Sequence, residues 1–97
     1  MSEPRKARAV EVFVDNRDLP FVFKLHATED SAAISEMIGM IDDDQSVLIG
    51  WELRQVLDRE GAPYFCEHVT PVIIPKTRVN YMKIRQILLA DDHKDTP

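Results

Sequence analysis

Residues 69–88 read VTPVIIPKTRVNYMKIRQIL, and this stretch decides the fold that the sequence predicts. It is rich in β-branched and apolar residues, and Pro75-Lys76-Thr77-Arg78 divides it into two runs. Branched side chains favour strands, whereas proline and polar residues favour turns. We therefore expect two β-strands joined by a tight polar turn, with the rest of the chain packed around them.

The N-terminal half predicts a β-hairpin followed by one helix. Residues 9–15 and 21–27 alternate with the two-residue period of half-buried strands, on either side of a segment of turn residues. The helix is expected to begin at Thr28 as the N-cap and to end at Asp42-Asp43-Asp44, where carboxylates oppose the helix dipole. Four apolar residues recur at helical spacing, namely Ile34, Met37, Ile38 and Ile41. Either these helix residues face the core, or Met37, Met40 and Ile41 lie beside carboxylates in a patch that meets a basic partner.

The segment that follows is ambiguous between strand and helix. Alternating apolar residues from Val47 to Leu53 favour a strand, whereas residues 54–60, followed by Gly61, also suit a short helix with a glycine stop. We favour a strand that continues to about Leu57, a turn over residues 58–63, and a returning strand over residues 64–69. Pro71 and Pro75 donate no ladder hydrogen bonds, so we expect the strand that contains them to be kinked or to lie at an edge.

These elements predict a single α+β domain with the order β-β-α-β-β-β. We expect a small, mostly antiparallel sheet of about five strands with one amphipathic helix packed on it. The strand–polar turn–strand of residues 69–88 resembles small five-stranded barrels of the Sm-like kind, which implies a small barrel as the alternative. A chain of 97 residues makes one domain, with residues 1–8 expected as a flexible basic arm and residues 91–97 as a flexible tail.

Composition and sequence pattern predict a cytoplasmic protein that does not span a membrane. The net charge is −5, and the one cysteine excludes an internal disulfide, as is usual in a reducing compartment. No apolar run approaches the roughly 18 residues of a membrane span, and the basic N-terminus lacks the apolar core of a secretory signal.

Charge is distributed unevenly along the chain. Residues 26–60 hold nine acidic residues and two arginines, a net −7, whereas residues 68–90 hold four basic residues and no acid. An aromatic ring beside cations is the composition of a surface on which nucleic-acid bases stack. The candidate nucleic-acid-binding residues are Lys76, Arg78, Tyr81, Lys83 and Arg85, helped by Arg5, Lys6 and Arg8. The alternative is that these cations are solvated and protect an edge strand from aggregation.

No catalytic or metal-binding motif emerges from the sequence. Cys66 and His68 share one side of a strand, yet no glycine-rich loop or oxyanion signature accompanies them. A zinc site from His26, Cys66 and His68 lacks paired spacing. A calcium loop beginning at Asp42 lacks its glycine and its final glutamate. We therefore expect a protein that is not an enzyme, with no metal and no cofactor.

Three functional hypotheses follow. The first is a regulatory or protein-interaction module that binds another protein or forms a homodimer, with candidate contact residues Phe13, Phe65, Asp42, Asp43 and Asp44. The second is a domain that binds single-stranded nucleic acid, especially RNA, through the acid-free C-terminal strands. The third is a small-ligand pocket between helix and sheet, to which Trp51 or Tyr64 contributes.

Overall fold

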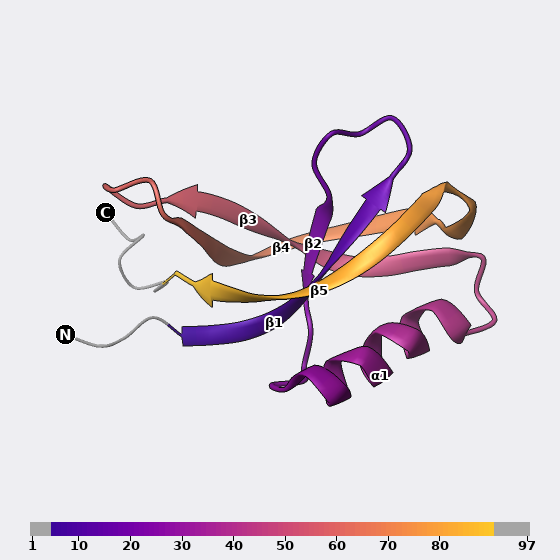
Figure 1. The fold of residues 1–97 in the computed structure, drawn as a ribbon. Helices are drawn as coiled ribbons and strands as arrows, with labels where there is room; N and C mark the ends of the chain where they lie inside the picture. Colours follow the sequence, from indigo (N-terminus) through magenta and orange to yellow (C-terminus); the bar gives the residue numbers. More distant parts are fainter. Residues whose placement is uncertain (1–4, 91–97) are drawn as a thin grey trace.

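A computed structural model describes residues 5–90, apart from the side chains of His68 and Val69. The described part has the predicted α+β architecture and the predicted order of elements (Figure 1). The elements are β1 (Arg5–Val14), β2 (Phe21–Lys24), α1 (Asp30–Asp42), β3 (Val47–Leu57), β4 (Pro63–Pro75), the 3₁₀ turn η1 (Lys76–Arg78) and β5 (Val79–Leu89).

The five strands form a closed ring in the order β1-β2-β3-β4-β5, built around two long antiparallel ladders. One ladder joins β1 to β5 along almost their whole lengths, and the other joins β3 to β4. The ladders are connected through the short strand β2, which is antiparallel to β1. The other two strand pairings contain one residue pair each. Phe23 pairs with Glu52 between β2 and β3, and Phe65 pairs with Leu89 between β4 and β5.

The expected C-terminal strand pair needs a correction. β4 and β5 are joined by a tight polar turn, as predicted, but they do not form a hairpin ladder because they pair at one position only. The turn instead passes the chain from the β3 ladder to the β1 ladder. Pro71 and Pro75 remove two backbone donors from β4, which limits the ladders that this strand can form.

Helix α1 lies on one side of the ring and ends at Asp42, as predicted (Figure 1). Its start was wrongly predicted, because the N-cap is Glu29 rather than Thr28 and its side chain makes no capping hydrogen bond. Ala33 is completely buried, and two methionines pack partly against the core.

The alternative in which all four periodic apolar residues of the helix face the core is wrong for three of them. Ile34, Ile38 and Ile41 are 47%, 52% and 50% exposed. The rotation of the helix is instead set by the small Ala33, which is buried against the sheet, and by Glu36, which bonds to the chain after β2. At about 100° per residue, the three isoleucines then fall on one flank of the helix.

The core consists of two clusters that contact opposite faces of β1. Val10 and Val12 belong to the cluster under the helix, and Ala7 and Ala9 belong to the other. Because successive side chains of a strand point to opposite faces, β1 is buried on both sides. The second cluster includes Phe65, which is 3% exposed, so the expectation that Phe65 is an exposed contact residue is wrong.

The ambiguous segment is a strand as far as Leu57, as we favoured. The turn after it is closed by two backbone hydrogen bonds, from the Asp58 N–H to the Ala62 carbonyl and from the Gly61 N–H to the Asp58 carbonyl, and Gly61 takes a positive φ of 84°. Strand β1 begins at Arg5, so residues 5–8 belong to the sheet rather than to an arm. Residues 1–4 and the expected tail of residues 91–97 lie outside the described residues. Within residues 5–90, no helix has the length and apolar character needed to cross a membrane.

Candidate functional site

An aromatic pair with a nearby ammonium lies at neighbouring positions of β1 and β5. Phe13 and Tyr81 are cross-strand neighbours, and their rings stack with centroids 4.5 Å apart and planes inclined by 12°. The Lys83 Nζ lies 5.5 Å from the Phe13 centroid and 5.7 Å from the Tyr81 centroid. Aromatic stacking and cation–π attraction therefore connect three of the predicted contact residues.

The structure brings together only part of the predicted nucleic-acid-binding set. Tyr81, Lys83 and Arg85 are exposed on β5, and the Arg85 guanidinium donates to the Glu11 carboxylate at 3.0 Å. Lys76, in contrast, is directed to the helix. Arg78 is exposed in η1. The cationic surface on β5 is therefore smaller than the sequence predicted, and Glu11 partly neutralises it.

Lys76 supports the C-terminal end of α1. Its Nζ donates to the Asp43 carboxylate at 2.6 Å and to the backbone carbonyls of Ile41 and Asp43 at 2.9 and 3.2 Å. The hydrogen bond from Lys76 and a second one from the Gln45 N–H lower the pKa of Asp43. A lysine that binds the last carbonyls offsets the repulsion between the helix dipole and the acidic residues. Asp42, Asp43 and Asp44 are all exposed, and Lys76 is the structural partner of Asp43.

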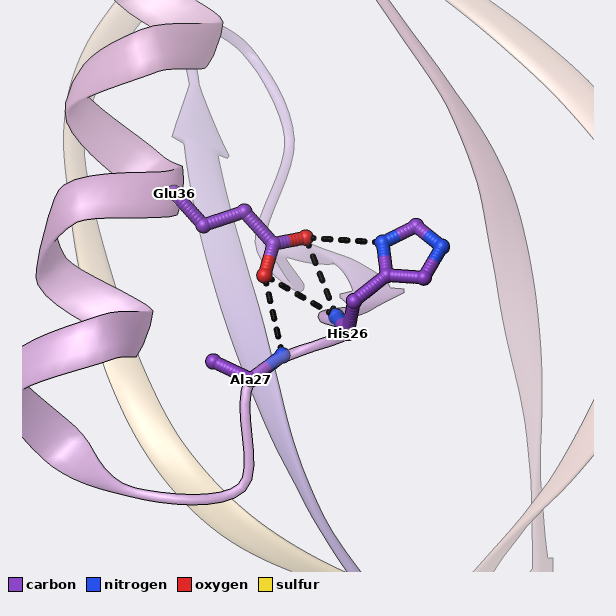
Figure 2. Close-up of polar contacts among 3 residues, drawn as sticks. All are labelled: His26, Ala27 and Glu36. Carbon is purple, nitrogen blue, oxygen red and sulfur yellow. Dashed lines mark hydrogen bonds and ion pairs between the residues drawn. The ribbon is translucent and has the colours of Figure 1, made fainter.

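Glu36 ties α1 to the chain that follows β2 (Figure 2). Its carboxylate accepts hydrogen bonds from the backbone N–H groups of His26 and Ala27 at 3.0 Å, and it lies 3.1 Å from His26 Nδ1. Partial burial would raise the pKa of Glu36, but these hydrogen bonds and the nearby imidazole together lower it. A fixed carboxylate therefore sits beside the exposed His26. No pattern in the sequence predicts this link, because the Glu36 carboxylate binds backbone groups of a segment about ten residues away.

Apart from Leu19, Leu57 and Tyr81, the large apolar side chains that are exposed among the described residues form two groups. The first, which we term the isoleucine row, consists of Ile34, Ile38 and Ile41 on α1. The second lies on the outer side of the β3–β4 ladder, where Ile49 pairs with Ile73 and Trp51 pairs with Pro71. Sequence reasoning missed the isoleucine row because helical spacing alone does not show which flank of a helix meets the sheet.

The residues that the sequence analysis considered for catalysis or metal binding are Cys66, His68 and His26. Cys66 is buried, at 5% exposure, and the side chain of His68 lies outside the described residues. His26 is exposed and contacts Glu36. Among the residues with described positions, no three histidine, cysteine or acidic side chains come together in a way that could hold a metal ion.

Comparison of the chain with protein-family models, curated proteins and solved structures found no match in any of the three.

Proposed function

We propose that this protein is a small, non-catalytic, cytoplasmic interaction module that binds another protein, or a second copy of itself, through α1. The observation that carries the proposal is the isoleucine row, in which three large side chains at positions 34, 38 and 41 are each about half exposed. An amphipathic helix in a small domain ordinarily turns such residues inward. Here the helix buries Ala33 instead and leaves the isoleucines in water.

Physical chemistry supports a partner for this row. Apolar surface gains free energy only when it is removed from water, by about 25 cal/mol for each Å². Exposed clusters of large apolar side chains bordered by polar residues are typical of protein-binding sites. The segment from Glu29 to Asp44 contains six acidic residues and no basic residue, so a partner with basic residues is the complementary one.

Site-specific photo-cross-linking tests the proposal. A benzophenone amino acid is placed at Ile38, and the matched control places it at Gln55, which is exposed on β3 away from the helix. After irradiation in host extract, position 38 is expected to give a discrete protein adduct, identified by mass spectrometry, which position 55 does not give. Equal adducts from both positions, or none from position 38 in extract and in concentrated pure protein, would contradict the proposal.

Binding of single-stranded RNA is the second candidate, and it is favoured by a separate observation. Tyr81 is 51% exposed beside Lys83, so a base could stack near the Phe13–Tyr81 pair while the ammonium meets phosphate. We test this with a fluorescently labelled oligonucleotide at low and high salt. Binding that weakens with salt and is lost in Tyr81→Ala would support RNA binding. Unchanged anisotropy at low salt would exclude it.

A further inference from the structure

A cleft of about 510 Å³ lies between α1 and the strands β2 and β3. This volume lies within the range that binding pockets usually have. Its apolar lining combines buried and exposed side chains from three elements. They are Phe23 of β2 and Leu25 just after it, Met40 of α1, and Leu53 with the exposed Ile49 and Trp51 of β3.

Gly50 keeps the β3 wall of this cleft in place. A Cβ atom at position 50 would lie 2.7 Å from Cδ2 of Phe23, which is closer than non-bonded carbon atoms approach one another in proteins. Glycine therefore allows the β3 backbone to lie directly against the Phe23 ring. Any larger residue would displace Phe23, which is 3% exposed and belongs to the core.

The polar lining of the cleft includes two acidic and two basic side chains. It contains the carboxylates of Glu36 and Glu67, with the ammonium of Lys24 and the imidazole of His26. Glu36 is bound to backbone N–H groups and to His26, as Figure 2 shows. Lys24 and Glu67 make a contact of 3.4 Å between side chains that are each about 40% exposed. Exposed pairs of this kind are weak and exchange readily with other charges.

We propose that this cleft receives a lysine or arginine side chain from the protein partner of α1. The inference rests on the proposed function and specifies the chemistry of that partner. The aliphatic stem of a long basic side chain suits the apolar walls. Its cation would then lie near the indole of Trp51 and the two carboxylates, which attract it by cation–π and charge interactions.

Trp51 is the sole tryptophan of the chain, so its fluorescence reports on the cleft directly. The probe is a peptide of about 14 residues in which leucine and lysine alternate at helical spacing. The matched peptide replaces each lysine by glutamate. Addition of the lysine peptide is expected to change the emission of Trp51 in a saturable way that weakens with salt, and the glutamate peptide is expected to have no effect.

Two conservative variants distinguish binding by the carboxylates of the cleft from a general attraction to the negatively charged protein. Glu67→Gln removes a carboxylate of the cleft and is expected to weaken binding of the lysine peptide by roughly two- to fivefold. Glu60→Gln, in the exposed turn between β3 and β4, removes the same charge elsewhere and is the control. Equal effects of the two variants, equal binding of both peptides, or unchanged Trp51 emission would overturn the inference.

These results are distinguishable from failure of the proposed function. If lysine-peptide binding leaves Trp51 unchanged while position 38 still cross-links to a protein, the cleft proposal falls and the interaction module remains. If position 38 gives no adduct, the proposed function falls whatever the peptide does.

Discussion

Helix α1 and strand β5 each carry a row of three exposed side chains. The rows differ in whether these side chains find partners within the protein. On β5, Tyr81 stacks on Phe13, Lys83 lies near both rings, and Arg85 pairs with Glu11. On α1, the isoleucine row stays about half exposed. Polar and charged groups can be satisfied by neighbours or by water, whereas apolar groups gain only by being covered. Exposure on the helix therefore points to a partner more directly than exposure on the strand.

The largest expected effect on stability comes from a change at the contact between the helix and the sheet. Ala33→Leu adds volume where the side chain is completely buried, and it should lower the free energy of unfolding by about 1–3 kcal/mol. Chemical denaturation of the variant checks this value. Ile34→Leu, one residue along and half exposed, is the control and should stay close to wild type. If both variants behave alike, the rotation of α1 described above is wrong.

Glu36→Gln tests the second constraint on the helix. The variant should lose about 1–2 kcal/mol at neutral pH, because hydrogen bonds to an ionised acceptor are stronger than those to a neutral one. The pKa of Glu36 is lower in the folded protein than its ordinary value of 4.5, so its contribution is present above that value and is lost as the pH falls below it.

Denaturation curves at neutral pH and at pH values below 4.5 measure this contribution. The wild type should lose more stability than Glu36→Gln over this range, and the matched control is Glu60→Gln in the β3–β4 turn. A variant with the same pH dependence as the wild type would show that the carboxylate does not hold the helix through its charge.

Lys83→Gln probes the row on β5. It removes an ammonium that lies 5.5 Å from the Phe13 ring centroid, and cation–π contacts at exposed sites contribute about 0.5–1 kcal/mol. A loss of stability of that size indicates that the Lys83 cation stabilises the fold. If the strand binds RNA, the same variant should also reduce the slope of log affinity against log salt by about 1. An unchanged slope removes Lys83 from any RNA contact.

The smallest effect on stability is expected for the isoleucine row. Ile38→Ser should change the free energy of unfolding by no more than about 0.5 kcal/mol, as surface substitutions usually do. Thermal and chemical denaturation measure it. A loss above 2 kcal/mol would mean that Ile38 is part of the core, and the contrast between the two rows would then disappear.

The sequence predicted the elements of this fold better than their packing. Alternation identified β1 to β4, and Leu57 followed by turn residues marked the end of β3, because these signals are local. The predicted hairpin of β4 and β5 was wrong, because the two strands pair at one position only, although sequence neighbours joined by a tight turn usually form a hairpin. The exposure of Ile34 and the burial of Phe65 were missed as well. Both depend on contacts with segments far along the chain, which a periodic pattern does not reveal.

The candidate site was predicted in part. The two-residue period of a strand places Tyr81, Lys83 and Arg85 on one face of β5, on which Ile87 and Leu89 are buried. Lys76 has the same charge and lies nearby in sequence, but it binds the end of α1. The acidic end of the helix creates the need for such a cation, and only the fold shows which residue supplies it.

The most direct test of the account compares the two rows against one partner. The protein captured from position 38 is purified, and its affinity is measured by calorimetry for the wild type and for two double variants. Ile38→Ser with Ile41→Ser is expected to weaken binding at least about tenfold, as loss of central apolar contacts does, while Tyr81→Ala with Lys83→Ala leaves it near the wild-type value. Retained affinity in the isoleucine variant, with loss in the β5 variant, would contradict the account.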